Sequence, residues 1–542
     1  MAKKDLETYF NEEMSYLREQ GDLFSKKYPH VSSTLNISKY KSKDPHVERL
    51  IEAFAFLTAK LQKRHDENLS KIGESIVDVL HPHYSKVKPA FSIAEFTPNS
   101  AYTVSIKKNT EIVAPNKSKF KTLMDTQIYP MRLKRTSVQG DFLTLTFSYS
   151  KLIKFSKLTL HVQGDKNRAA AIFESLKGGE VYYSFGEEDQ SPLKNANFQF
   201  FGYNKDETVT ASTYDNYSYT LLQDFFFYPE KFLFASLNLD ELPKPPNNEF
   251  TLWLPYEKGS TEPKNSDFNF SAAPVVNLFE ISTDPIVIDH KKSAYPLTIS
   301  AYKPDDYEIH TILQLKCDEK EIKPFFNKND TDEFYYSSFK TESLIENILG
   351  ADTFIRLHSN SQDSLKERKV VYGKVWATNR NRVNEITEND IFTSTIPIPK
   401  IKLLQRPHYF PYKADRDFWK LISQLSINHL YFSDNATSLS LLKKILRLNG
   451  AHGDLVNLLK SITFKNTANR FTKDGIYGYL RGVEITIEAQ IKSTVIILSK
   501  VLHKFFSAQV SLNNFVSLKL VDFDTKQEVR SWNAVIGQQK TL

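Results

Sequence analysis

The sequence predicts an α+β protein of several domains, with a helical N-terminal region, β-rich central domains and a mixed α/β C-terminal domain. The chain of 542 residues is several times longer than an average domain of roughly 150 residues, so several cores are expected. Apolar residues recur at helical spacing before residue 90 and after residue 400, whereas short alternating runs rich in β-branched and aromatic residues lie between. We expect domains at residues 1–90, 91–245, 246–400 and 401–542.

A first helix is predicted within the opening residues. The apolar residues of this stretch fall three or four positions apart, as on one face of a helix: Leu6, Phe10, Met14 and Leu17. Gly21 offers a break after them, because glycine is a poor helix former.

A further helix is predicted to begin at Pro45. Asp44 can accept an N–H bond as the N-cap, and the ring of Pro45 fixes a φ that suits the first helical position. The following apolar residues form one stripe, which we expect to be buried: Val47, Leu50, Ile51, Phe54, Leu57 and Leu61. The pattern resumes as a second helix at Ile72, Ile76, Val79 and Leu80, and it ends where Pro82 restricts its predecessor and cannot donate a hydrogen bond. Two paired helices are therefore expected before a first strand at Phe91.

The remaining elements follow from the local period of the apolar residues. Strands are predicted at residues 91–96, 102–106, 142–150, 157–162, 180–185, 232–239, 250–256, 285–289, 312–316, 354–358 and 370–377. After residue 400, helices are predicted at residues 417–430, 437–448 and 493–509, and strands at residues 483–489 and 515–523. This alternation of helix and strand is typical of a mixed α/β domain.

The composition is that of a soluble cytoplasmic protein. The start, MAKKDLETYFNEEM, has no apolar signal region, and no run approaches the ~18 apolar residues of a membrane span. A lone cysteine, Cys317, cannot form an internal disulfide, and we expect it to be buried and inert. The net charge of +7 comes from 71 basic and 64 acidic residues, so it is a weak indication of an anionic partner.

Sequence motifs for catalysis, cofactors or metals are absent. There is no phosphate-binding glycine loop, no H-E-x-x-H and no G-x-S-x-G. The glycines of GIYGYLRG have the wrong spacing for phosphate binding, and we interpret them as turn residues: Gly475, Gly478 and Gly482. His81 and His83 are the best metal candidates, but the proline between them and the lack of nearby ligands favour a helix end. The basic runs at residues 39–46 and 117–121 are interpreted as solvated charge, because no nucleic-acid-binding module accompanies them.

Two segments carry a specific family resemblance. DPHVERLIEAFAFLTAKLQ, starting at Asp44, and VLHPHYSKVKPAFSIAEF, starting at Val79, resemble the N-terminal region of TssF, a baseplate subunit of bacterial type VI secretion systems related to the wedge proteins of contractile phages. Further similar segments follow in the expected order: FFFYPEKFLFASL at 225–237, PVVNLFE at 274–280, ATNRN at 377–381, LSINHL at 425–430 and VSLNNFVSL at 510–518. One departure is the missing proline after Trp532, where the family tends to have one.

The resemblance implies a structural protein without catalysis, cofactors or membrane insertion. TssF-like proteins are expected to pair as two copies with one TssG, in wedges that surround a spike hub. These wedges dock on the membrane complex through TssK and template the sheath through TssE, so the chain is expected at the cytoplasmic face of the inner membrane. The C-terminal domain is expected, by the same analogy, to join TssF copies of neighbouring wedges.

The N-terminal region suggests how such a wedge is held together. We hypothesise that residues 5–90 join an intersubunit helical bundle, with Leu6, Phe10, Met14 and Leu17 as the contact residues. The alternative is that these four residues pack inside the chain, against Val47 to Leu61. Two other functions also stay open at this point: an enzyme with a site assembled from distant residues, and a module that binds an anionic ligand or nucleic acid.

Overall fold

The structure is a computed structural model. It describes residues 5–30, 45–80, 82–84, 86–98, 102–149, 154–186, 190–196, 198–210, 217–245, 248–257, 259, 261–325, 334–343, 345–346, 348–359, 368–412, 435–473, 476–510 and 514–537. Two compact units make up the chain. The first comprises Met1–Tyr84 with Lys413–Ser426, and the second comprises Ser85–Tyr412 with Ile427–Leu542.

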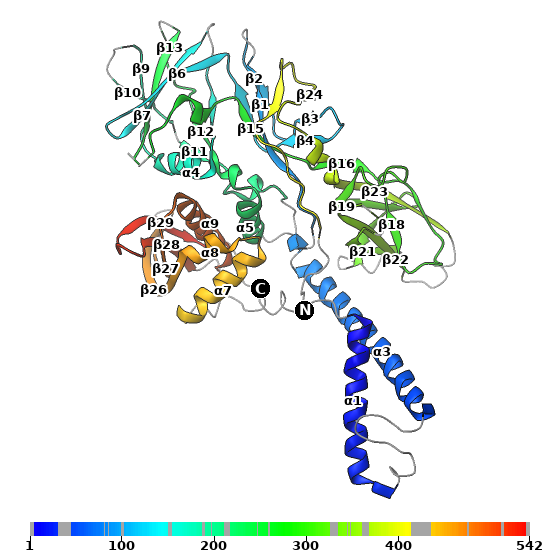
Figure 1. The fold of residues 1–542 in the computed structure, drawn as a ribbon. Helices are drawn as coiled ribbons and strands as arrows, with labels where there is room; N and C mark the ends of the chain where they lie inside the picture. Colours follow the sequence, from blue (N-terminus) through cyan, green and yellow to red (C-terminus); the bar gives the residue numbers. More distant parts are fainter. Residues whose placement is uncertain are drawn as a thin grey trace. The chain divides into compact units, whose positions relative to one another are not determined.

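Two long helices dominate the described part of the first unit, side by side in Figure 1: α1 (Leu6–Lys27) and α3 (Pro45–Leu80). The predicted start at Pro45 and the predicted end before Pro82 are confirmed. Two predictions were wrong. α1 continues through Gly21, because one glycine costs a helix only about 1 kcal/mol and packing on α3 offsets that cost. α3 is one helix of 36 residues, and the pairing joins α1 to α3.

A six-stranded sheet lies at the centre of the second unit, with the strand order β24-β3-β4-β15-β1-β25. In that order the strands are Thr393–Ser394, Glu111–Val113, Lys119–Thr122, Ala272–Val276, Phe91–Phe96 and Ile401–Leu403. β1 starts at Phe91 as predicted and pairs antiparallel with β15, Phe91 lying opposite Val276. The sheet thus takes strands from both sides of residue 245, where a domain boundary is expected. The four-domain division itself stays a prediction.

Smaller sheets and short helices flank this sheet. One sheet has the order β10-β9-β13-β7-β6, and its strands are Ser191–Pro192, Tyr182–Ser184, Glu249–Pro255, Phe142–Tyr149 and Met131–Gln139. Another has the order β11-β12-β8-β14, with strands Phe198–Phe200, Phe234–Asn238, Lys157–Val162 and Phe268–Asn269, and β2 (Val104–Ile106) pairs with β5 (Thr126–Ile128). The helices of this part are α4 (Lys166–Ser175), η2 (Lys205–Glu207), α5 (Tyr217–Phe227), η3 (Pro229–Leu233) and η4 (Asn265–Asp267).

An eight-stranded sheet is formed by the part of the sequence between β15 and β24, which both belong to the six-stranded sheet. We call residues 279–378 the inserted β-domain. Its strands are β16 (Phe279–Ser282), β17 (Ile286–Ile288), β18 (Tyr295–Leu297), β19 (Glu308–Cys317), β20 (Lys320–Pro324), β21 (Phe334–Glu342), β22 (Ala351–Ser359) and β23 (Lys369–Thr378). The chain leaves through η7 (Arg380–Glu385). Cys317 lies in the core of this domain, as predicted for an inert thiol.

The C-terminal module alternates helices and strands. It contains α7 (Asn435–Leu448), α8 (Gly453–Leu458), β26 (Leu459–Lys473), β27 (Ile476–Ala489), α9 (Ser493–Gln509), β28 (Asn514–Asp522) and β29 (Glu528–Ile536). α9 connects the parallel strands β27 and β28, as a crossover helix does. The predicted α+β class, with its helical start, β-rich centre and mixed C-terminal part, is confirmed. The helix predicted at 417–430 lies outside the described residues.

Two of the three glycines that were predicted to be turn residues lie in a strand, so the prediction was wrong for them. Gly478 and Gly482 lie within strand β27, and Gly475 is outside the described residues. Gly482 faces Phe515 on the neighbouring strand β28, and a Cβ at this position would come within 2.5 Å of the Phe515 ring. The glycine is therefore used for close approach between strands.

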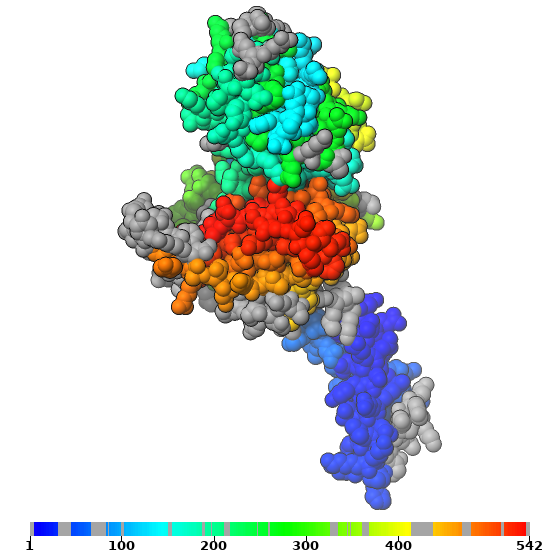
Figure 2. All heavy atoms as spheres, turned by 90° about the vertical axis from the view of Figure 1, so that its left-hand side faces the viewer, coloured from blue at the N-terminus to red at the C-terminus, as the bar shows by residue number. Residues whose placement is uncertain are grey.

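The C-terminal module packs on the helices of the central sheets. Arg530 Nη2 donates to the backbone oxygen of Glu174 in α4 at 3.0 Å, and the Phe505 ring of α9 contacts the Tyr219 ring of α5 with centroids 5.3 Å apart. Figure 2 shows the orange and red residues of this module against the cyan and green ones. The C-terminal module of the second unit thus packs against helices α4 and α5 from the centre of the chain.

Candidate interaction surface

The two helices of the first unit pack through small side chains. Ala55 and Ala59, one turn apart on α3, are completely buried, and Met14 of α1 is nearly so. Alanine lets two helix backbones approach closely, and it is also the best helix former. This pairing therefore uses one face of α3.

Polar contacts fix the antiparallel alignment of the pair. The hydroxyl of Tyr9 donates to Asp66 Oδ2 at 2.8 Å, near the start of α1, whereas Arg18 Nη2 donates to Glu48 Oε1 at 3.1 Å, nearer its end. Glu48 is 6% exposed, so its pairing with Arg18 satisfies a carboxylate that packing has removed from most of its water. Helix α1 is thereby held on one face of α3.

A different face of α3 carries large apolar side chains that nothing in the described residues covers. Their spacing is four, three and four residues, the heptad spacing of a coiled-coil seam. The four residues are between 57% and 65% exposed, and we call them the α3 stripe: Leu50, Phe54, Leu57 and Leu61. At roughly 100° per residue they lie on one side of the helix, away from Ala55 and Ala59.

The sequence prediction that these positions are buried was wrong for the four residues of the α3 stripe. Val47 and Ile51, which belong to the same predicted set, are half-buried beside the face that α1 covers. A single neighbouring helix covers only part of the surface of α3. Among the described residues, none covers the remaining apolar face of α3.

The exposed area is large enough to drive association. Complete burial of a leucine or phenylalanine side chain contributes about 1.5–3 kcal/mol, so burying the exposed part of each stripe residue contributes about 1–2 kcal/mol. Apolar residues that are exposed together on one helix face mark interaction sites in soluble proteins. The α3 stripe is therefore the candidate functional site of the first unit.

The residues predicted for intersubunit contact lie on α1 rather than in this stripe. Met14 is 7% exposed, and Leu6, Phe10 and Leu17 are half-buried. Their assignment to a partner contact stays a prediction. The sequence signal for the α3 stripe is the four-three-four spacing itself, which by its period alone predicts burial.

Only some of the other candidate residues from the sequence lie in the described part of the chain. His83 lies in the 3₁₀ turn η1 after α3, and His81 and Asp44 are outside the described residues. Within the ranges given above, no cluster of three or more histidine, cysteine or acidic residues has the arrangement of a metal site. None of the described helices combines the length and apolar character needed to cross a membrane.

The basic run at residues 117–121 is also used inside the fold. Lys119 pairs with Glu111 at 3.2 Å, and Lys121 Nζ lies 4.7 Å from the centre of the Trp376 ring. Burial, together with the nearby Lys108, lowers the pKa of Lys121. Lys121 thus connects the six-stranded sheet to the inserted β-domain, which corrects the interpretation of this run as solvated charge at that position.

The chain matches a known protein family over almost its whole length. Residues 2–539 match the family described as "Type VI secretion system, TssF". The chain belongs to the TssF family. The match spans both compact units, including the helical pair with the α3 stripe.

Relatives of known function agree with this assignment. The "Type VI secretion system component TssF1" of Pseudomonas aeruginosa is 22% identical over 98% of this chain and 99% of its own length. A chain of the TssK-TssF-TssG baseplate subcomplex of the type VI secretion system matches 90% of this structure with a TM-score of 0.73 at 20% identity. A chain of the type VI secretion baseplate complex matches 99% of it with a TM-score of 0.57 at 18% identity. These two likenesses show a shared fold, and TssF family membership makes the chain a structural subunit of the secretion baseplate.

Proposed function

We propose that this chain is a non-enzymatic wedge subunit of a type VI secretion baseplate and that it binds its partner subunits through the α3 stripe. The observation that carries the proposal is the α3 stripe itself, a heptad seam of four apolar residues that the pairing with α1 leaves exposed. Such a seam is suited to bury itself against further helices.

The proposed partners are a TssG-like subunit, a TssK-like subunit and a second copy of this chain. The first two are named with TssF in the solved subcomplex whose fold this chain shares. The second copy, a TssE-like subunit and the spike hub come from the family resemblance. We propose that two copies of this chain and one TssG-like subunit form a helical bundle that includes the α3 stripe, in the cytoplasm at the inner-membrane face.

The proposal is tested by co-expressing the chain with the TssG-like subunit of the same secretion system and measuring how much of that subunit copurifies. The test variant is Phe54→Ser, which removes one 64% exposed ring of the α3 stripe. Loss of about 2 kcal/mol of apolar burial weakens the complex about 30-fold. Because Phe54 has little contact inside the chain, the helical content by circular dichroism should stay unchanged.

The matched control is Phe56→Ser. Phe56 lies on the same helix but off the stripe, and it is 47% exposed. Copurification should survive this change. The proposal is contradicted if Phe54→Ser and Phe56→Ser both leave the yield of the TssG-like subunit unchanged, or if both reduce it equally.

The predicted contact residues of α1 have their own test in the same assay. If Leu6, Phe10, Met14 and Leu17 touch a partner directly, Phe10→Ser should reduce copurification without loosening α1 from α3. Hydrogen exchange of residues 6–27 measures whether α1 has loosened from α3. A variant that loosens α1 before it affects copurification would assign these residues to packing inside the chain.

A further inference from the structure

The inserted β-domain is tied to the six-stranded sheet by two asparagines at its root. The domain is entered after Asn277 and left at Asn379, which are 102 residues apart in sequence. Asn277 Nδ2 donates to Asn379 Oδ1 at 2.8 Å, and the backbone N–H of Asn379 donates to Asn277 Oδ1 at 2.7 Å. The same amides bind both backbone groups of Lys119 on β4, at 2.7 and 3.0 Å. The two connecting segments are therefore joined to each other and to the sheet.

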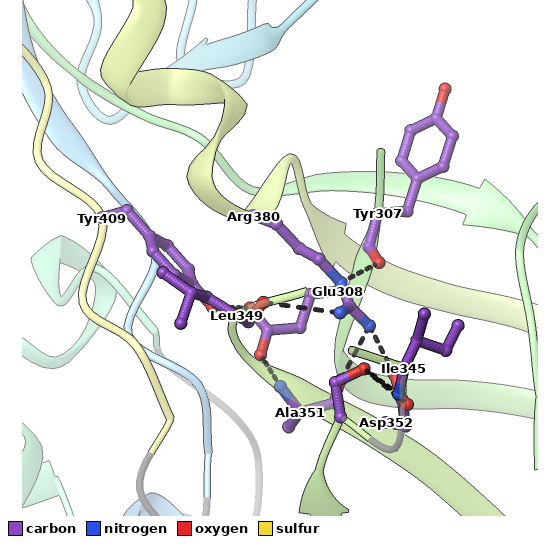
Figure 3. A network of polar contacts seen from close by, with 9 residues as sticks. Tyr307, Glu308, Ile345, Leu349, Ala351, Asp352, Arg380 and Tyr409 are labelled. Carbon is purple, nitrogen blue, oxygen red and sulfur yellow. Dashed lines mark hydrogen bonds and ion pairs between the residues drawn. The ribbon is translucent and has the colours of Figure 1, made fainter. Parts of the chain in front are cut away.

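Arg380, the next residue, fastens the exit segment to the inserted β-domain. Its guanidinium donates to the backbone oxygens of Tyr307 at 2.6 Å and Ala351 at 3.1 Å, and to Asp352 Oδ1 at 2.6 Å. Figure 3 shows this side chain reaching between the strands that carry these acceptors. Arginine is suited to this role because its planar group presents several donors in fixed directions.

Tyr409 makes another contact across the joint, by which we mean the contact region between the six-stranded sheet and the inserted β-domain. Its ring belongs to the core of the six-stranded sheet, and its hydroxyl donates to Glu308 Oε2 of the inserted β-domain at 3.0 Å (Figure 3). The other oxygen of Glu308 accepts the N–H of Ala351 at 2.5 Å. Gly350 lies against this pair, because a Cβ there would come within 2.3 Å of the Tyr409 hydroxyl. The contact is close-packed as well as hydrogen-bonded.

The joint also holds backbone strain. Arg380 has a φ of +47°, in the left-handed region that a long side chain adopts only when the surroundings require it. Such conformations cost about 1–3 kcal/mol and persist where the surrounding contacts fix them. The neighbouring Arg382 adds an ion pair with Asp306 at 2.6 Å and a hydrogen bond to Asn116 at 2.7 Å.

We propose that the network of Asn277, Asn379, Arg380, Glu308 and Tyr409 is a rigid coupling, which makes the inserted β-domain and the six-stranded sheet move as one body. Two covalent connections alone would allow the domain to swing. The network removes this freedom, because the two connecting segments are bonded to each other and to the sheet, and the exit segment is also bonded to the inserted β-domain through Arg380. A force that acts on the inserted β-domain is then transmitted to the six-stranded sheet, because the two parts do not rotate relative to each other. Such transmission suits a subunit with a mechanical role.

The test measures the distance between a spin label on each side of the joint, by double electron–electron resonance on the full-length chain. Tyr302→Cys in the inserted β-domain and Lys107→Cys beside β2 are exposed label sites, with Cys317 replaced by alanine. The parent should give one narrow distance distribution. Arg380→Gln should broaden it, while the hydrogen-exchange protection of β19 and β23 in the inserted β-domain stays close to that of the parent.

Two further variants make the result decisive. Tyr409→Phe removes a single hydroxyl and should broaden the distribution less than Arg380→Gln does. Lys374→Gln is the matched control, because it breaks an exposed ion pair with Glu280 at 3.0 Å within the inserted β-domain, and it should change nothing. If Arg380→Gln does not fold, Tyr409→Phe decides.

A distribution as narrow as the parent's in both Arg380→Gln and Tyr409→Phe would overturn the proposal, as would a broad distribution in the parent. The measurement needs no partner subunit. Its outcome is therefore independent of whether the α3 stripe binds a TssG-like protein.

Discussion

The buried ion pair between Lys231 and Asp224 yields a sharp prediction about stability. Lys231 follows α5 in the turn η3, and neither its side chain nor that of Asp224 is more than 2% exposed. Asp224 Oδ2 also accepts the backbone N–H of Val209 at 2.9 Å. Lys231→Met removes the ammonium and keeps the length of the side chain, but it leaves a buried carboxylate without its counter-charge. The expected loss is about 3–5 kcal/mol of local stability.

The assay is native-state hydrogen exchange, read by mass spectrometry on peptides that cover α5 and β12. It reports the opening free energy of this segment, which a single unfolding transition of a chain with several cores would not. The double variant Lys231→Met with Asp224→Asn removes both charges, so it should recover at least ~2 kcal/mol of the loss. Lys166→Met is the control, because Lys166 is 73% exposed in its pair with Glu230 and should cost less than ~1 kcal/mol.

Two outcomes would refute this reasoning. The first is a loss of less than ~1 kcal/mol for Lys231→Met, because the carboxylate would then have to be solvated or neutral in the fold. The second is a double variant no more stable than Lys231→Met alone, which would assign the loss to packing of the lysine chain rather than to its charge.

Two further predictions concern the C-terminal module. Gly482→Ala should loosen β27 from β28 by about 1–3 kcal/mol, because its Cβ would collide with the Phe515 ring, whereas Gly478→Ala, with nothing within 4 Å, should be neutral. Equal hydrogen-exchange protection of β28 in the two variants would contradict this. Glu174 lies where α9 packs, and burial raises its pKa from 4.5 to about 7, so the folded state holds a proton that the unfolded state releases. Its contribution to stability is therefore complete below pH 4.5 and lost as the pH rises through 7. Glu174→Gln should make the melting temperature less dependent on pH over this range. An unchanged pH profile of the melting temperature would count against this prediction.

The proline signals predicted the ends of α3 well, whereas the glycine signal at Gly21 did not end α1. The start of α3 at Pro45 and its end at Leu80 depend on prolines that act on their immediate neighbours, and both are found. The predicted strands of the centre and helix α9 likewise follow from period and residue type alone. Such features need no knowledge of what lies nearby in space.

Features that depend on distant residues were not predictable. The period of α3 shows which residues share a face, but only the position of α1 shows that Leu50 and Phe54 are left exposed. Gly482 looked like a turn residue because the strand that carries Phe515 follows much later in the chain. The bond between Tyr409 and Glu308 joins residues 101 positions apart, for which a single sequence contains no signal.

The most direct test of the proposed function is native mass spectrometry of the complex purified through a tag on this chain from cells that express the whole secretion system. The account predicts a particle of two copies of this chain and one TssG-like subunit, which dissociates when Phe54 is replaced by serine. A lone chain in the wild-type sample, with no baseplate subunit even after gentle crosslinking, would contradict it.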